Sequence, residues 1–367
     1  MASKEHDFSV GSIPRNIISL ALPMTAAQLI NVLYSVVDRI YLGRLPGHLA
    51  LTGLGLTLPI ISIVMGFANL CGTGGAPLCS IYRGKGEEEE AERIMGNAFT
   101  LLLIFGAAVT GVFLLFRHPL LYLFGASDAT YPYAEAYMTI YLLGTVFVMI
   151  GLGMNPFITS QGFGRTGMMT VGLGAVVNIV LDPVFIFALD MGVRGAALGT
   201  IMARLFECAA VLVYMYRIER TVCFTPKWLL RFRSGLFSDY VRNSVPVVSN
   251  ELLWALGVAV TNLTIGHMGP SFTSAVSIVN VVNNLVSVFI FGMANATAVV
   301  VGKTIGEGRL ADARRAANST VVVSVVLSLV GTALLLAGGF AVAGAAVSLA
   351  RIRLPLPEGL KRIKNEK

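Results

Sequence analysis

Nine apolar stretches of membrane-spanning length are the feature that most constrains the fold of this chain. A helix needs about 20 consecutive apolar residues to cross the hydrocarbon core of a bilayer. Stretches of at least that length lie at 17–42, 53–81, 97–116, 133–155, 168–190, 195–216, 243–266, 272–302 and 318–349. With 55% hydrophobic and 13% charged residues, the chain is too apolar for a water-soluble protein of 367 residues. We therefore expect an all-α polytopic membrane protein, because helices satisfy their backbone hydrogen bonds inside lipid.

Residues 20–100 and 243–320 are two copies of one segment. Pro23 in the first copy corresponds to Pro246 in the second, with an offset of 223 residues. Further on, Gly84 corresponds to Gly306 with an offset of 222. Two homologous membrane halves that face each other across a substrate site are a common plan of secondary transporters. The repeat therefore predicts two homologous helical bundles and favours transport as the function.

The repeat also predicts the domain boundaries. We expect a six-span lobe at 1–216, a basic cytoplasmic linker at 217–242, an incomplete second lobe of three spans at 243–349 and a basic tail at 350–367. A second lobe like the first would need three more spans. Nine spans would also place the six positive charges of the tail on the outer side, where basic residues are disfavoured. Both points suggest a truncated or frame-shifted version of a twelve-span protein.

The basic residues lie mainly on one side of the predicted spans. With a cytoplasmic N-terminus, the inner segments hold 16 Lys and Arg residues and the outer loops hold three. This asymmetry predicts a multi-pass protein with a cytoplasmic N-terminus. The net charge of +7 comes from these short loops, so a nucleic-acid partner is not expected. The four cysteines show no metal-ligand or redox spacing and are expected to be packing residues.

Two acids in the outer half of the membrane mark a candidate ion site. Ionisable groups cost roughly 2.5–3.5 kcal/mol inside a bilayer, so each needs a function or a partner. Asp38 lies near the outer end of the first span, and Asp182 lies at a similar depth in the fifth. Asn178 is one helical turn before Asp182, and Thr200 reaches a similar depth in the sixth span. These oxygen atoms predict a pocket for a proton or a small hard cation such as Na⁺.

Each acid of this pocket also has a simpler interpretation. Asp38 can reach the membrane surface beside Arg39 as an interfacial acid. Asp182 precedes Pro183, which removes an amide donor and can open the helix, so Asp182 can be a polar group at a kink. The sequence leaves both interpretations open.

Two further acids occur within the spans. Glu207 follows Arg204 by three residues, and an ion pair within the helix explains it more simply than a site does. Glu251 lies near the middle of the seventh span, where the first copy has Gln28. An acid that faces a cavity there can contact a cationic cargo, and a packing role is equally compatible with the sequence.

Glycine-rich motifs do not support an enzyme or an ATP-driven pump. The pattern at 162–167 joins two membrane helices, whereas a dinucleotide site joins a strand to a helix. The Gly302-Lys303-Thr304 segment lacks the earlier glycine of a phosphate loop, since position 297 is Thr297. We therefore expect a transporter that is not an enzyme and has no cofactor other than a coupling ion.

The motifs around Pro23, Asp38 and Gly84, the Asn178-to-Asp182 element and their echoes in the second copy resemble the multidrug and toxic compound extrusion (MATE) family. The resemblance covers about residues 13–345. It implies antiport of organic cations or other xenobiotics against Na⁺ or H⁺ across the cytoplasmic membrane, by rocking of two lobes in a protein that is monomeric when complete. It implies a coupling site formed by Asp38, Asn178, Asp182 and Thr200, and cavity residues Tyr137, Asn155 and Glu251.

Two other functions remain open from the sequence. A flippase for lipid-linked precursors, from the same broad superfamily, would need a cationic central cavity, whereas the spans offer Arg204 and little else that is positive. A fragment without transport activity is the other alternative. The sequence does not distinguish Na⁺ from H⁺ and does not define the cargo range.

Overall fold

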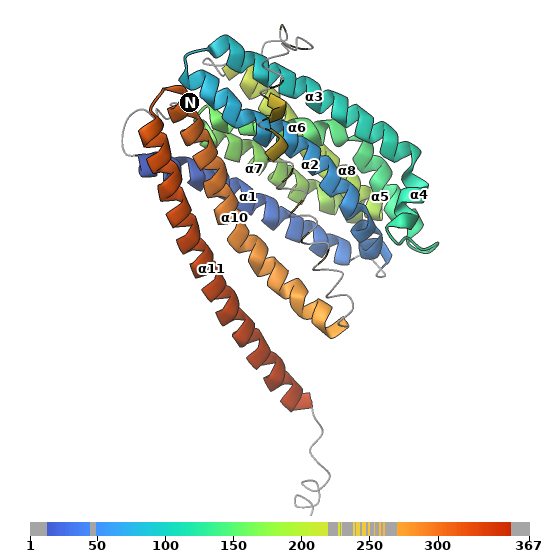
Figure 1. Ribbon diagram of the computed structural model, residues 1–367. Coiled ribbons are helices and arrows are strands. Elements are labelled where there is room, and N and C mark those ends of the chain that lie inside the picture. Colours follow the sequence, from blue (N-terminus) through green and yellow to red (C-terminus); the bar gives the residue numbers. More distant parts are fainter. Residues whose placement is uncertain are drawn as a thin grey trace, which may run out of the picture.

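The protein is a bundle of long helices, described by a computed structural model (Figure 1). The structure describes residues 13–44, 49–218 and 270–353, and only separate residues between 219 and 269. The helices are α1 (Ile13–Gly43), α2 (Leu49–Gly84), α3 (Glu88–Leu115), α4 (Arg117–Leu123), α5 (Tyr131–Leu143), α6 (Thr145–Ser160), α7 (Gly164–Pro183), the π-helical turn η1 (Val184–Ala188), α8 (Gly192–Val213), the π-helical turn η2 (Tyr214–Ile218), α10 (Pro270–Gly306) and α11 (Leu310–Arg353). No described residue belongs to a strand, so the all-α prediction is confirmed.

Most of the expected spans correspond to single helices. Within the described ranges, six helices are long and apolar enough to cross a membrane: α1, α2, α3, α7 with η1, α8 and α10. The expected span at 318–349 lies within α11, and the expected span at 243–266 lies outside the described residues. α11 has 44 residues, and Figure 1 shows it extending beyond the rest of the bundle.

The expected span at 133–155 is not one straight helix. It forms α5 and α6, which meet at Gly144 with a bend of 57°. A β-carbon at Gly144 would lie 2.7 Å from the Cγ1 of Ile201 on α8, so a larger residue here would displace the Ile201 side chain. The bend therefore lies where α8 packs closely against the junction.

The two copies of the repeat meet along α2 and α10. A β-carbon at Gly306 would lie 2.9 Å from the Cα of its equivalent, Gly84. A β-carbon at Gly302 would lie 3.3 Å from the Cβ of its equivalent, Ser80. Equivalent residues touch each other only near a two-fold axis, so the two copies are related by a pseudo-two-fold axis at the end of the bundle where α1 begins.

α1 joins the two parts of the bundle near the same end. Its first turns pack against the end of α10 and the start of α11 through a buried apolar cluster, which contains Ile17, Leu20, Ala21, Ala296, Val299, Val300 and Ala316. Along its length, α1 also lies against α7. Figure 1 shows α10 between α1 and α11. α1 therefore contacts both α7 and α10.

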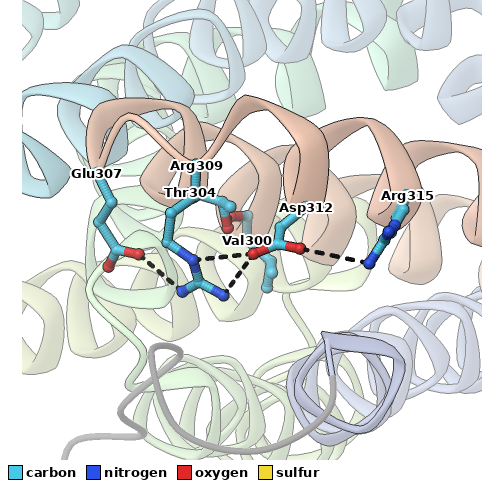
Figure 2. A network of polar contacts seen from close by, with 6 residues as sticks. All are labelled: Val300, Thr304, Glu307, Arg309, Asp312 and Arg315. Carbon is cyan, nitrogen blue, oxygen red and sulfur yellow. Dashed lines mark hydrogen bonds and ion pairs between the residues drawn. The ribbon is translucent and has the colours of Figure 1, made fainter.

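A polar network fixes the tight turn between α10 and α11 (Figure 2). Arg309 donates hydrogen bonds to Asp312 Oδ2 from Nε at 3.1 Å and from Nη2 at 2.9 Å, and its Nη1 donates to Glu307 Oε2 at 3.2 Å. These hydrogen bonds, first of all those to Asp312, raise the pKa of Arg309. Gly308 has a φ of +77°, and its equivalent in the first copy, Gly86, has a φ of +78°. The repeat therefore extends to the left-handed residue that closes each turn.

Candidate ion and cargo site

Asp38 and Asp182 meet between α1 and α7, as the depth argument predicts. The Asp38 carboxyl lies close enough to Asp182 for the two acids to interact electrostatically. Asp182 is fully buried, and its Oδ1 accepts a hydrogen bond of 3.0 Å from Nδ2 of Asn178, which is one turn earlier on α7. Two ionised carboxylates repel each other when they are close and buried, so a proton or a small cation shared by them would stabilise the pair.

α8 completes the wall around this pair. Thr200 lies beside Tyr137 of α5, which in turn lies near Asp38. One residue earlier, Gly199 leaves room for the Asp182 carboxyl, because a β-carbon at Gly199 would overlap Asp182 Oδ1 and lie 3.3 Å from its Cγ. The four predicted ion-site residues are thus brought to one place, and Tyr137 adjoins them.

The chain changes conformation directly after Asp182. α7 ends at Pro183 and continues as the π-helical turn Val184–Ala188. Proline supplies no amide hydrogen, so the regular hydrogen-bond ladder is interrupted at this point. Isolated π-helical turns occur frequently at functional sites. The helix opening that Pro183 predicts is observed beside the carboxyl pair.

A polar stripe on α1 leads from this pair toward the middle of the bundle. Gln28, Asn31, Tyr34 and Asp38 recur at spacings of three and four residues, which places them on one helix face. Facing this stripe, α8 carries Thr200, Arg204 and Glu207 at the same kind of spacing.

Arg204 lies at the centre of the contact between these two stripes. Its Nη1 donates to Glu207 Oε2 at 2.5 Å, and its Nη2 donates to the hydroxyl of Tyr34. Its guanidinium also lies over the Tyr34 ring, with Cζ 5.3 Å from the ring centroid. The predicted ion pair of Glu207 with Arg204 is confirmed, and it continues onto α1.

A cavity of about 450 Å³ lies beside the inner end of the polar stripe, which suits a drug-sized ligand. Four α2 residues line it, and their four repeat equivalents on α10 line it from the other side. These pairs are Asn69 and Phe291, Thr73 and Asn295, Ala76 and Ala298, and Pro77 and Val299. The cavity therefore lies at the interface between the two copies, where the repeat predicts a substrate site.

The predicted cavity residues have different positions. Asn155 lines the cavity, and its Nδ2 also donates to the Gly167 carbonyl oxygen at 3.0 Å and to Thr170 Oγ1 at 2.9 Å, so it joins α6 to α7. Tyr137 lies beside the carboxyl pair and is not among the described lining residues. Glu251 lies outside the described residues. Cys71, Cys79 and Cys208 are buried, in agreement with their expected packing role.

Sequence reasoning missed Tyr34 as a member of the site. It lies one turn before Asp38 on α1, so the helical spacing of polar residues contained the signal. Its partner Arg204 is 170 residues away in sequence, and no local pattern could indicate that contact. Asn69, Thr73 and Asn295 were also missed, although comparison of the two copies aligns Thr73 with Asn295.

This combination of spanning helices, a two-fold repeat and a polar cavity between the copies defines a polytopic membrane protein with a transporter fold. The MatE family model matches the chain twice, over residues 23–184 and 246–344. The chain therefore belongs to the MatE family, in agreement with the resemblance found in its motifs. The two matched segments begin at the equivalent prolines, Pro23 and Pro246, which supports the repeat independently.

Curated relatives and solved structures agree with this assignment. The chain is similar to the multidrug export protein MepA of Staphylococcus haemolyticus, with 26% identity over 262 residues, covering 71% of this chain and 58% of that protein. MepA of Staphylococcus aureus is 24% identical, also over 262 residues that cover 71% of this chain and 58% of that protein. The chain thus spans about three-fifths of the length of these relatives. A crystal structure of a MATE transporter in complex with MaD3S superimposes with a TM-score of 0.84 at 23% identity, covering 91% of this chain and 75% of that one.

Proposed function

We propose that this protein is a secondary active multidrug exporter, or the part of one that holds the ion site and most of the cargo cavity. It exchanges organic cations and other xenobiotics for Na⁺ or H⁺ across the cytoplasmic membrane, with its N-terminus in the cytoplasm. The buried Asp182, hydrogen-bonded to Asn178 and placed near Asp38 where α1 packs on α7, is the observation that carries this proposal. In an antiporter, a buried acid pair of this kind serves as the site that alternately binds and releases the coupling ion.

The mechanism follows from the placement of the two acids on different helices. When a proton or Na⁺ neutralises the pair from outside, α1 and α7 stay in contact at Asp38 and Asp182. When the ion leaves to the cytoplasm, the two negative charges repel and favour separation of these helices. Because α1 also packs against α10, this change alters the cavity between the two copies. Ion binding and cargo affinity are therefore coupled through α1.

The polarity of the cavity supports a cationic or neutral cargo. Its described lining residues include no lysine or arginine, and Glu207 is the charged residue among them. A flippase for anionic lipid head groups would need a cationic surface, so the cavity favours drug export over that alternative. Met24, Met168 and Phe291 supply polarisable and aromatic surface that suits flat organic cations of varied shape.

We further propose that residues 1–216 form the first lobe, that 217–242 form a cytoplasmic linker, and that 243–349 contribute three spans to the second lobe, with a basic tail at 350–367. Tyr240, within the proposed linker, is 4% exposed, and its hydroxyl donates to the Cys71 carbonyl oxygen of α2 at 2.7 Å. This contact supports an association of the end of the proposed linker with the proposed first lobe. A complete transporter of this kind is expected to act as a monomer.

Efflux of ethidium from bacterial cells that lack their own drug pumps tests the proposal. Cells that express the 367-residue chain should retain less dye than empty-vector cells, and Asp38→Asn and Asp182→Asn should each abolish the difference. Asp128→Asn is the matched control, because Asp128 lies in an exposed turn where it accepts a hydrogen bond from Tyr122. Equal efflux by all variants would reject the acid pair as the coupling site. A chain without efflux would favour the non-transporting alternative.

Proteoliposomes identify the coupling ion. Purified protein is reconstituted with the dye, and a Na⁺ gradient or a pH gradient is applied separately. The gradient that drives dye movement in the wild-type protein and fails in Asp38→Asn identifies the ion. Movement driven equally by both gradients in Asp38→Asn would contradict coupling at this pair.

A further inference from the structure

We propose that Glu207 binds the N–H-bearing ammonium group of a cationic cargo in the cavity between the two copies. This inference rests on the proposed export of organic cations and names one binding residue and the chemical class it selects. The cargo class is a primary or secondary ammonium, an amidinium or a guanidinium, as opposed to a quaternary cation.

Glu207 forms an ion pair with Arg204 through one carboxylate oxygen, and its other oxygen has no hydrogen-bond donor among the described residues. The residue is 1% exposed, and its Oε2 accepts from Arg204. Its other oxygen, Oε1, is buried and has no hydrogen-bond partner among the described residues. A carboxylate has acceptor sites on both oxygens, and leaving one of them bare in a protein interior is unfavourable. A donor that reaches Oε1 therefore removes an existing penalty.

Gly174 makes room for the Glu207 side chain, and Gly151 packs against it. A β-carbon at Gly174 on α7 would lie 3.2 Å from Glu207 Oε2, which is a tight contact, and one at Gly151 on α6 would lie 3.7 Å from Glu207 Cδ, which is an ordinary contact. The carboxylate is thus held between three helices in the wall of the cavity. This packing limits its movement, which favours a defined binding geometry over adventitious contact.

The position of Arg204 explains why this ion pair attracts a cation. Glu207 lines both the large cavity and a void of about 10 Å³ beside it, whereas Arg204 lines only the void. Tyr34 also holds the guanidinium on the side of α1. A cation in the cavity therefore meets the negative member of the pair first, and the positive member lies behind it. Although the pair has no net charge, its orientation favours a cation in the cavity.

The unpaired oxygen also defines which cations bind best. A site built to hydrogen-bond a ligand N–H discriminates strongly against an analogue that lacks it, because the buried acceptor then stays unpaired. A trimethylammonium group carries the same charge but no donor. The primary ammonium should therefore bind at least about tenfold more tightly, since hydrogen bonds to charged groups contribute about 1.5–3 kcal/mol.

Binding of dansylcadaverine, a fluorescent primary ammonium, and of its N,N,N-trimethyl derivative tests this proposal. The full chain is reconstituted in lipid nanodiscs, and the dissociation constant of each probe is measured from dansyl fluorescence. Arg204→Met with Glu207→Met removes both charges together, so that neither is left buried alone. Arg117→Met with Glu135→Met is the matched control, because that ion pair of 3.0 Å lies outside the described cavity lining.

We expect the wild type and the control to prefer the primary ammonium at least about tenfold, and the Arg204/Glu207 double variant to lose this preference. Glu207→Asp keeps the ion pair's charges but withdraws the carboxylate by one methylene, so it should reduce the preference even if the double variant does not fold. An unchanged preference in these variants would overturn the role of Glu207 and leave cation export intact. Failure of the wild type to bind either probe would overturn the proposed cargo class itself.

Discussion

Gly199 is a single residue on which the geometry of the proposed ion site depends. The Asp182 carboxyl fills the space that a side chain at position 199 would occupy. Gly199→Ala would therefore force Asp182 away from α8. We expect this variant to lose dye efflux to about the same extent as Asp182→Asn, with an overpacking cost of about 1–3 kcal/mol. Efflux from pump-deficient cells measures the loss, and scanning fluorimetry of the purified protein measures the destabilisation.

Gly111→Ala is the matched control for Gly199→Ala. Gly111 lies on α3, and no atom lies within 4 Å of a β-carbon built there. Alanine should raise the stability of this helix by about 0.5–1 kcal/mol and leave efflux unchanged. Normal efflux by Gly199→Ala would show that Asp182 does not need its observed position.

The buried ion pair of Arg204 with Glu207 gives a second prediction at the residue scale. Arg204→Met alone leaves a buried carboxylate without its partner and should destabilise the protein by about 3–5 kcal/mol. Replacing both residues by Met should restore most of that stability, because no charge is then left unpaired. Thermal unfolding of the purified variants measures this recovery.

The exposed pair of Arg117 with Glu135 provides the comparison. The Arg117 and Glu135 side chains are 42% and 31% exposed, so Arg117→Met should change stability by less than about 1 kcal/mol. A similar effect of Arg117→Met and Arg204→Met would contradict the buried position of Arg204.

At the scale of elements, α2 and α10 pack backbone to backbone near the end of the bundle where α1 begins. A β-carbon at Gly306 would overlap the carbonyl oxygen of Ile81 and lie 2.9 Å from the Cα of Gly84. Backbone atoms cannot rotate away as a side chain can, so Gly306→Ala must push the two helices apart. We expect the variant to favour a conformation that is open at the end where α1 begins.

Distances between spin labels at Glu88→Cys and Leu310→Cys measure this opening, in a protein whose native cysteines are replaced. Both positions are exposed near the ends of α2 and α10. Gly306→Ala should shift the distance distribution to longer values. The control, Gly55→Ala on the same α2 helix, meets no atom within 4 Å and should leave the distribution unchanged. Identical distributions for both variants would exclude a gating role for this contact.

The sequence predicts the straight elements well because lipid imposes one simple requirement, a long apolar helix. It does not predict the bend at Gly144, because the apolar pattern continues through the junction and Ile201, which packs there, is 57 residues further along the chain. The π-helical turn after Asp182 is different. Its cause, Pro183, is local, and the sequence therefore predicts an opened helix at this point.

The candidate site is predictable to a similar degree. The depth of Asp38 and Asp182 in the membrane predicts that they lie near each other, and depth follows from counting residues along each span. Contacts that depend on helix rotation, such as Tyr34 with Arg204, require the packed structure. Asn155 combines both cases, because it lines the cavity as the family resemblance implies and also joins α6 to α7 through hydrogen bonds that the sequence does not show.

At the scale of the whole molecule, the two copies of the repeat together form the wall of one cavity. Equivalent residues of α2 and α10 line its opposite walls, and the equivalent glycines Gly84 and Gly306 meet at one end. In the proposed mechanism, rocking of the two copies against each other, about an axis perpendicular to the pseudo-two-fold axis, would open one end as it closes the other. Because α1 contacts both α7 and α10, the proposed mechanism uses it to link the Asp38–Asp182 acid pair to this interface.

The charge carried in one transport cycle gives a prediction for the molecule as a whole. If one coupling ion enters for each cargo that leaves, export of a neutral cargo moves one net positive charge inward, whereas export of a monocation moves none. A potential of 100 mV contributes about 2.3 kcal/mol per charge. It should therefore raise the limiting gradient of a neutral cargo about fiftyfold and leave that of a monocation unchanged, since about 1.4 kcal/mol corresponds to a factor of ten.

Proteoliposomes with a potential set by K⁺ and valinomycin measure this difference at a fixed ion gradient. Dansylcadaverine serves as the monocation, and its N-acetyl derivative serves as a neutral cargo of similar shape. Voltage should increase accumulation of the neutral probe alone, and Asp38→Asn should remove the effect because the acid pair carries the coupling ion. A voltage response of equal size for both probes would instead require at least two coupling ions for each monocation, which is more positive charge than the single pair of Asp38 and Asp182 is expected to hold.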